Sequence, residues 1–310
     1  MKRKKVSVLG AGNVGASLAQ HLVMGGISDV VLYDIAPGVP QGKALDLGEA
    51  CPLWGSSVSI KGTNTIEETA GSDVVVITAG LARKPGMSRD DLLQANASII
   101  GVVAGEAAAH SPKSVIIMIT NPMDVMAHLA WKSSKFPPER VLGMGGVLDS
   151  ARLRAFIAWQ LDVSPKDVDA MVLGGHGDQM VPVRSLISVK GVGIDSLLPD
   201  EKIEHIVERT RNGGAEIVAL LKTGSAYYAP AASACEMVKA ILFDEKRLMP
   251  CAAYLDGQYG AKGVYAGVPV LLGKGGVEKI LEVPLTSGEK AAFDRSVSAV
   301  GQLVSVLGLS

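Results

Sequence analysis

The chain has 310 residues, of which 48% are hydrophobic and 20% are charged, a globular composition that excludes wholesale disorder. Its 30 basic and 31 acidic side chains leave a net charge of −1, which argues against the basic surface of a nucleic-acid-binding protein. The longest apolar runs have the length of strands, well short of the roughly 18 residues that a membrane helix needs, so we expect neither a nucleic-acid partner nor a membrane partner.

The first half of the sequence alternates short apolar runs with longer helical segments. The runs predict strands over residues 5–9, 30–33, 58–61, 73–78 and 114–119, and helices over 14–24, 39–50 and 90–109. Nearly continuous apolar strands separated by helices are typical of a parallel sheet that is covered on both faces. This half is therefore predicted to be an α/β domain.

The pattern changes after about residue 145. The remaining sequence predicts helices over 149–161, 201–221, 226–242 and 286–307, and strands over 168–173, 263–272 and 276–280. Such an order indicates an α+β domain. We therefore predict two domains, residues 1–145 and 146–310, with the boundary near the glycines of segment 143–146.

A glycine-rich turn follows the first predicted strand and precedes the first predicted helix. It fits the pattern G-x-G-x-x-G and consists of Gly10, Ala11, Gly12, Asn13, Val14 and Gly15. The first glycine permits a tight turn, the second lets the backbone approach a pyrophosphate, and the third lets the helix pack on the sheet. The N–H groups at the helix start then face the anion, so this turn is the predicted dinucleotide-binding segment.

An acidic residue ends the second predicted strand, about 20 residues after the last glycine, as the dinucleotide motif requires. This residue, Asp34, can accept hydrogen bonds from an adenosine ribose, and its charge would repel a 2′-phosphate. We therefore expect NAD rather than NADP. The alternative is an ordinary strand-to-helix turn that binds nothing.

A basic loop follows the strand predicted at 73–78. Arg83, Lys84 and Arg89 surround a Pro-Gly turn there. Ligands of doubly wound sheets bind beyond the carboxyl ends of the strands, which places this loop over the cofactor crevice. The alternative is a solvated basic loop.

Three further segments carry side chains suited to chemistry. Asn121 follows the strand predicted at 114–119 and could bind a ribose or substrate oxygen, or could be only a turn residue. Asp149 and Arg152 share a helix face, although Asp149 could instead cap that helix. His176 stands among glycines after an apolar run, whereas the other histidines fall in helical segments. A bend there can present an imidazole, the natural general acid–base near neutral pH.

Over its whole length the chain resembles the lactate/malate dehydrogenase family. The resemblance rests on four motifs in this order: the glycine turn, Thr120-Asn121-Pro122, Leu148-Asp149-Ser150-Ala151-Arg152 and Gly174-Gly175-His176-Gly177-Asp178. It implies an N-terminal Rossmann domain that binds NAD, a C-terminal α+β substrate domain, and an oxidoreductase activity on a 2-hydroxy acid.

The resemblance also implies a role for each residue. His176 would exchange the proton, Asp149 would orient and stabilise its charged form, and Arg152 would hold the substrate carboxylate in a two-pronged pair. Arg89 would polarise the reacting carbonyl when the loop closes, so no metal is required. The family's NAD contacts fall on Asn96, Ile119, Thr120 and Asn121, the last also touching substrate. Ser225 falls near a further pocket position.

The residue at position 83 bears on the choice of substrate. Lactate enzymes of the family typically have Gln there, and malate enzymes have Arg. Arg83 could pair with the second carboxylate of oxaloacetate, whereas pyruvate would leave the guanidinium buried and unpaired, at a cost of about 2–5 kcal/mol. The resemblance therefore implies a small dicarboxylate substrate, with (S)-malate and NAD converted reversibly to oxaloacetate and NADH.

Two alternative functions stay open: a lactate dehydrogenase and a catalytically silent NAD-binding scaffold. A short-chain dehydrogenase is excluded, because none of the six tyrosines has a lysine four residues later. Family resemblance favours a homodimer or a homotetramer. The basic start is followed too soon by glycines to be a secretion signal. The three cysteines are widely spaced without a CxxC pair, which predicts reduced thiols in a cytoplasmic protein.

Overall fold

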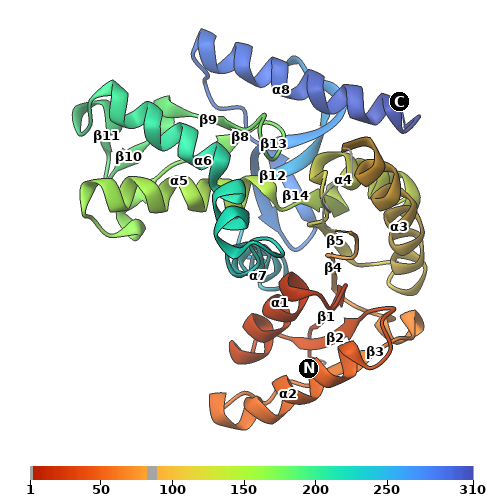
Figure 1. Cartoon of the computed structure of the whole chain (residues 1–310). Helices are drawn as coiled ribbons and strands as arrows, with labels where there is room; N and C mark the ends of the chain where they lie inside the picture. Colours follow the sequence, from red (N-terminus) through yellow and green to blue (C-terminus); the bar gives the residue numbers. More distant parts are fainter. Residues whose placement is uncertain (1–2, 82–88, 310) are drawn as a thin grey trace.

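The structure is a computed structural model that describes residues 3–81 and 89–309. Within these residues nine strands form one sheet in the order β14-β13-β12-β6-β5-β4-β1-β2-β3 (Figure 1). The strands are β1 (Lys5–Leu9), β2 (Asp29–Tyr33), β3 (Ile60–Thr63), β4 (Val74–Ile77), β5 (Val115–Met118), β6 (Val141–Gly143), β12 (Arg247–Asp256), β13 (Lys262–Gly273) and β14 (Gly276–Ile280).

The first six of these strands are parallel and have the order of a Rossmann fold, 3-2-1-4-5-6. The helices among them are α1 (Asn13–Met24), α2 (Val39–Trp54), α3 (Arg89–His110) and α4 (Met123–Ser134). The predicted parallel sheet with helices between its strands is confirmed. The strand expected over 58–61 is displaced, since β3 begins and ends two residues later.

The C-terminal part extends this sheet and adds helices and two small sheets beside it. Strand β12 pairs antiparallel with β6, and β13 and β14 follow as antiparallel neighbours. The helices of this part are α5 (Gly145–Leu161), α6 (Asp200–Leu221), α7 (Tyr228–Leu242) and α8 (Ser287–Val306). One small sheet consists of β7 (Val168–Asp169), β10 (Ser188–Val189) and β11 (Val192–Gly193). The other consists of β8 (Val172–Leu173) and β9 (Val181–Pro182).

The single strand predicted over 168–173 is wrong. Residues of that run belong to two short strands, β7 and β8, which pair in different small sheets. An apolar run shows that its residues are buried, but it does not show which neighbour each residue pairs with. The bend between the two strands turns the chain toward the glycines that precede His176.

Two apolar layers hold the large sheet between its helices. Val74 and Val76 of β4 face the layer that α1 and α7 cover, and Val75 and Ile77 face the layer that α3, α4 and α8 cover. This alternation follows from the two-residue period of a strand. Helix α7 belongs to the C-terminal part but packs on α1, so one core joins the two halves of the chain.

One helix of the described residues, α3, is long and apolar enough to cross a membrane by length and composition alone. In the structure its inner face packs against α4 and the sheet through buried residues such as Leu93, Ile100 and Ala104. A long core helix of a water-soluble domain has the same composition, so this feature is weak evidence for a membrane span.

Candidate active site

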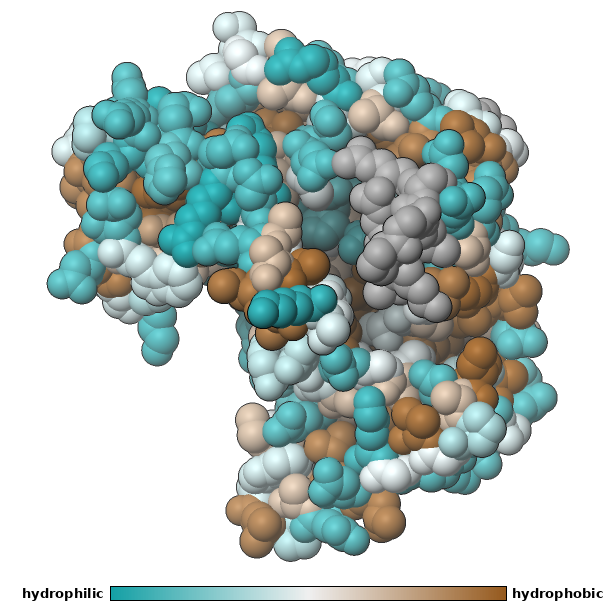
Figure 2. Space-filling view, in the orientation of Figure 1, coloured by the Kyte–Doolittle hydropathy of each residue, from teal (hydrophilic) through white to brown (hydrophobic). Residues whose placement is uncertain are grey.

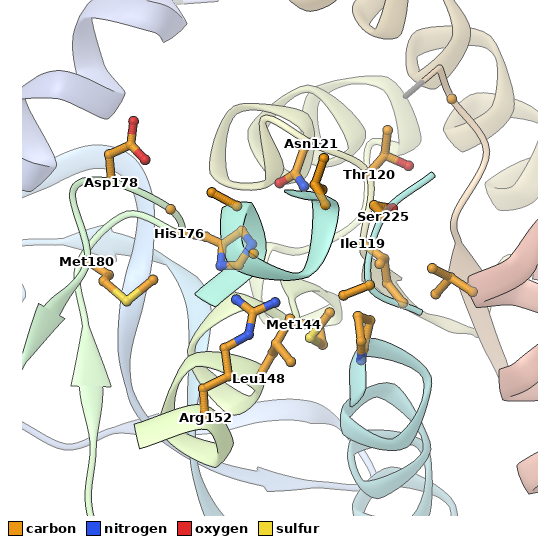
Figure 3. Close-up of a pocket in the computed structure, with 18 of the residues that line it drawn as sticks. Ile119, Thr120, Asn121, Met144, Leu148, Arg152, His176, Asp178, Met180 and Ser225 are labelled. Atoms are coloured by element: carbon orange, nitrogen blue, oxygen red, sulfur yellow. The ribbon is translucent and has the colours of Figure 1, made fainter. Parts of the chain in front are cut away.

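The pocket lies where the carboxyl ends of β1, β4 and β5 meet the C-terminal part. Its cavity of about 470 Å³ extends from Val14 at the start of α1, past Ile119 and Asn121, to Arg152 and His176. Figure 2 shows this face of the molecule hollowed at its centre, and Figure 3 shows the side chains that converge there. The structure thus brings Val14 of the glycine turn into one pocket with three of the predicted chemical residues, Asn121, Arg152 and His176.

The three glycines of the turn serve different needs. A Cβ atom on Gly10, whose φ is 112°, would come within 2.6 Å of Thr78 Oγ1, and one on Gly15 would collide with the carbonyl oxygen of Gly10. A Cβ on Gly12 would meet nothing within 4 Å. The fold therefore requires Gly10 and Gly15, whereas Gly12 leaves open the space that a close ligand would use. Gly12 also caps α1 without a side-chain hydrogen bond, so the N–H groups there fit an anionic pyrophosphate.

Asp34 lies beside this turn at the end of β2. Its Oδ2 accepts a hydrogen bond from the Ala11 N–H at 2.7 Å, and its Oδ1 accepts one from the Ala36 N–H at 3.0 Å. Lys43 Nζ donates to the Ala11 carbonyl at 2.6 Å. The Ala11 peptide is therefore held on both sides, and the contact of Asp34 with a ribose stays a prediction.

The ends of β4 and β5 are tied together by buried side chains. Asn96 is fully buried, and its amide accepts from the Leu81 N–H at 2.7 Å and donates to the carbonyls of Leu81 at 3.2 Å and Asn121 at 2.8 Å. Thr120 Oγ1 donates to the Ala79 carbonyl at 2.6 Å. These contacts hold the pocket wall formed by residues 119–121. The contact of Asn96 with NAD stays a prediction.

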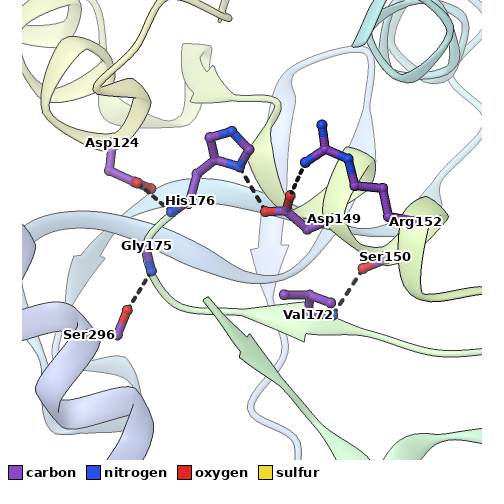
Figure 4. Close-up of polar contacts among 8 residues, drawn as sticks. All are labelled: Asp124, Asp149, Ser150, Arg152, Val172, Gly175, His176 and Ser296. Atoms are coloured by element: carbon purple, nitrogen blue, oxygen red, sulfur yellow. Dashed lines mark hydrogen bonds and ion pairs between the residues drawn. The ribbon is translucent and has the colours of Figure 1, made fainter. Parts of the chain in front are cut away.

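His176, Asp149 and Arg152 form the polar centre of the pocket (Figure 4). His176 Nδ1 lies 2.8 Å from Asp149 Oδ2, and Arg152 Nη1 lies 3.4 Å from Asp149 Oδ1. Asp149 is 1% exposed and lies within α5. It is therefore not a helix cap, which was the other interpretation of this residue in the sequence. Arg152 lines the pocket, and its Nε is buried without a hydrogen-bond partner among the described atoms.

The electrostatics of this centre favour a charged imidazole. Burial lowers the pKa of His176, but the carboxylates of Asp149 and Asp124 outweigh burial and the opposing charge of Arg152, so the net pKa is raised above its ordinary value. Burial lowers the pKa of Arg152, and Asp149 opposes that shift. A buried guanidinium beside one carboxylate is a suitable partner for a second, external carboxylate.

The loop that carries His176 is held by three separate elements, which sequence reasoning did not find. The N–H groups of Gly174, Gly175 and His176 donate to the Gly267 carbonyl at 2.8 Å, to Ser296 Oγ at 2.8 Å and to Asp124 Oδ2 at 2.7 Å. These partners lie far away in sequence, so no local pattern indicates them. The glycine at 145 was assigned only to a domain boundary, yet a Cβ there would lie 2.7 Å from His176 Cβ.

The structure describes some of the remaining predicted site residues and leaves others outside the described part. Ser225 lines the pocket, as the family resemblance implied. Arg83 lies outside the described residues, and Arg89 begins α3 but its side chain is not described. His128, by contrast, is buried among Trp131, Tyr254 and Tyr265, and burial lowers its pKa to about 4.

The described ranges hold neither a disulfide nor a candidate metal centre. Cys51, Cys235 and Cys251 are buried and unpaired there. No group of three or more His, Cys, Asp or Glu side chains within residues 3–81 and 89–309 is arranged to hold a metal ion.

Comparison with known proteins agrees with this geometry. Residues 4–143 match the NAD-binding domain of lactate/malate dehydrogenases, and residues 146–303 match their alpha/beta C-terminal domain. The chain is 55% identical to the malate dehydrogenase of Heliobacterium modesticaldum over 309 residues, which cover 100% of both chains.

Solved structures of both malate and lactate enzymes superpose on this fold. The malate dehydrogenase of Cryptosporidium parvum matches with a TM-score of 0.96 at 45% identity, covering 99% of each chain. The lactate dehydrogenase of the same organism, solved with lactic acid and NAD, matches with a TM-score of 0.97 at 44% identity, covering 100% of this chain and 99% of that one. The sequence, the pocket and these matches together show that the chain belongs to the lactate/malate dehydrogenase family of NAD-dependent oxidoreductases.

Proposed function

We propose that the protein catalyses the reversible oxidation of (S)-malate by NAD, giving oxaloacetate and NADH, with His176 as the proton acceptor and donor. The observation that carries this proposal is the contact of His176 Nδ1 with Asp149 Oδ2 beside Arg152, in the pocket that also reaches the glycine turn. Curated relatives named malate dehydrogenase, at 55–58% identity over nearly the whole chain, support the choice of substrate.

His176 is arranged to move a proton at one ring nitrogen. Because Nδ1 donates to Asp149, Nε2 is the nitrogen left for the substrate hydroxyl (Figure 4). In malate oxidation Nε2 accepts the hydroxyl proton, and the carboxylate of Asp149 stabilises the imidazolium that forms. In the reverse direction the imidazolium returns the proton to the carbonyl oxygen of oxaloacetate.

Arg152 is arranged to orient the substrate. Its guanidinium faces the pocket beside His176 (Figure 3), and it can hold the C1 carboxylate in two parallel hydrogen bonds. Asn121 lines the same cavity and can bind a substrate oxygen. These contacts would fix the C2 carbon at one distance and angle from His176, which is the main contribution of positioning to catalysis.

The N-terminal residues provide a site that fits NAD, which when bound supplies the nicotinamide ring that accepts the C2 hydride. The open space at Gly12 and the uncapped start of α1 would hold the pyrophosphate. Asp34 would bind the adenosine ribose, and residues 119–121 would hold the nicotinamide end. Arg89 would polarise the carbonyl of oxaloacetate, so the proposed chemistry uses no metal.

Arg83 is proposed to select the dicarboxylate by pairing with its C4 carboxylate. The Arg83→Gln variant should therefore lower the ratio of kcat/KM for oxaloacetate to that for pyruvate by about 30- to several-thousand-fold, because an unpaired carboxylate costs about 2–5 kcal/mol. Steady-state NADH oxidation with both substrates measures the ratio. The matched control is Lys84→Gln, which removes the neighbouring charge and should leave the ratio unchanged. Equal ratios for wild type and Arg83→Gln would contradict this role.

The proposed enzyme is a homodimer or a homotetramer. Large apolar side chains are exposed on and just before α2, with Ile35 82%, Leu45 65% and Leu53 87% exposed, as at surfaces that associate. Light scattering after gel filtration should give two or four times the 32.1 kDa chain mass. Leu45→Lys should shift this mass toward one chain, and the control Val306→Lys on α8 should not. A wild-type mass of one chain would contradict the proposal.

A further inference from the structure

Asp124 is a buried carboxylate that the proposed mechanism does not use. It lies in the first turn of α4 and is 4% exposed. Its Oδ2 accepts a hydrogen bond from the His176 backbone N–H at 2.7 Å, while its Oδ1 has no hydrogen-bond partner among the described atoms. Burying a carboxylate with one oxygen unpaired is costly, and a neutral side chain at this position would avoid that cost.

The contact of Asp124 completes the support of the loop that carries the imidazole. Gly174 is held by a carbonyl of β13 and Gly175 by a hydroxyl of α8, so the loop already has two uncharged anchors. Asp124 supplies the third anchor at His176 itself and is the charged one. Figure 4 shows Asp124 meeting the main chain of His176 while Asp149 meets its ring. The two carboxylates thus act on different parts of one residue.

The charges that shift the pKa of His176 lie on two helices, and Arg211 of α6 and Asp178 also line the pocket. Asp149 and Arg152 lie on α5, and Asp124 lies on α4. Burial raises the pKa of Asp124 to about 6, and the N–H and charge of His176 oppose that shift. Above about pH 6, Asp124 is therefore mainly a carboxylate, and its charge favours the protonated imidazole together with that of Asp149.

We propose that Asp124 is a positioning residue for His176: it fixes the main chain of His176 so that the ring meets Asp149, and it adds negative charge that favours the imidazolium. This inference rests on the proposed role of His176 as proton acceptor and donor. Asp124 is not among the described residues that line the pocket, so it acts through His176.

The Asp124→Asn variant separates the charge from the hydrogen bond, because an amide oxygen can still accept from the His176 N–H. Oxaloacetate reduction requires protonated His176, so kcat/KM should fall as pH rises through the pKa of that group. In Asp124→Asn this fall should move to lower pH by about half to one unit, with NADH affinity unchanged by fluorescence titration. Asp124→Ala also loses the acceptor, and its kcat should be about tenfold lower than that of Asp124→Asn.

The control variant is Ser296→Ala, which removes the uncharged anchor at the neighbouring Gly175 amide. It tests loop support without a change of charge, and its pH midpoint should equal that of wild type. If the pH midpoint of kcat/KM in Asp124→Asn equals that of wild type and only Tm is lower, Asp124 has a purely structural role at the start of α4. That result would overturn the inference.

Other measurements test the same role of Asp124. If Asp124→Asn does not fold, Asp124→Ser removes the charge with a smaller side chain and should show the same displacement. In wild type itself the midpoint should lie above the ordinary histidine value of about 6.5, and a lower midpoint overturns the inference. If His176→Asn retains wild-type turnover, the proposed function has failed, which is a different result from an unmoved midpoint.

Discussion

The His176→Asn variant should lower kcat in both directions by about 10²- to 10⁴-fold, the usual contribution of a positioned acid–base group. Asparagine can still donate a hydrogen bond toward Asp149, but it cannot accept or return a proton near neutral pH. The Asp149 contact and the buried loop support of His176 lie apart from the glycine turn, so NADH affinity should stay nearly unchanged. Stopped-flow or steady-state NADH oxidation, with fluorescence titration of NADH, measures both quantities.

A matched control for this variant is His205→Asn. His205 lies on the exposed face of α6, outside the described pocket lining, so its replacement should leave kcat within about twofold, as for ordinary surface positions. Wild-type turnover in His176→Asn would contradict the assignment of His176. Loss of NADH binding in that variant would instead indicate that the change has disturbed the fold of the pocket.

The Arg152→Lys variant should lower kcat/KM for oxaloacetate by about 30- to several-thousand-fold, from a loss of about 2–5 kcal/mol. Lysine keeps a positive charge beside Asp149 but cannot form two parallel hydrogen bonds to one carboxylate. The charge near His176 is thus preserved while the geometry of substrate binding is lost. The decrease should appear mainly as a higher KM, with part of it in kcat because the substrate is less well oriented.

Arg154→Lys provides the control on the same helix. Arg154 donates to the carbonyls of Val168 at 2.8 Å and Pro165 at 3.1 Å and does not line the pocket among the residues described. Its replacement should leave kcat/KM nearly unchanged, whatever its effect on stability. Equal KM values for Arg152→Lys and wild type would show that another group holds the C1 carboxylate.

Local patterns predicted the parallel half of the fold well. The strands around Val6, Val75 and Ile116 are short apolar runs, and the glycine turn follows directly after the first of them. Both features depend on neighbours within a few residues, and the close contact that excludes a side chain at Gly15 is made within the same turn. The order and type of these elements could therefore be predicted without knowing what packs on them.

Contacts between distant segments could not be predicted in this way. Strand β12 was not among the predicted strands. Within the structure Pro250 stands opposite Pro269 of β13, and β12 pairs with β6 at Ala252, opposite Gly143. The contact of Asp124 with His176 joins residues 52 apart. An acid near a helix start is common, so only the folded structure shows what this one holds.

The same difference between local patterns and contacts of distant segments applies to the site. The motifs around Asp149 and His176 predicted which residue types gather, and the structure adds the 2.8 Å contact of Nδ1 with Oδ2 and the burial of Asp149. It also assigns Gly145 a packing role against His176 rather than only a boundary. Arg83, on which the choice of dicarboxylate depends, lies outside the described residues, so its role is tested by kinetics.

The most direct test of the proposed function is the initial rate of NADH oxidation by the purified protein, with oxaloacetate and pyruvate compared at matched concentrations. A rate with oxaloacetate that is at least about 30-fold higher, as the cost of an unpaired buried arginine predicts, would support malate oxidation as the reverse reaction. A higher rate with pyruvate would contradict the pairing of Arg83 with substrate, although His176 could still serve a lactate dehydrogenase. No rate with either substrate, despite NADH binding, would contradict the enzymatic account and favour a silent NAD-binding scaffold.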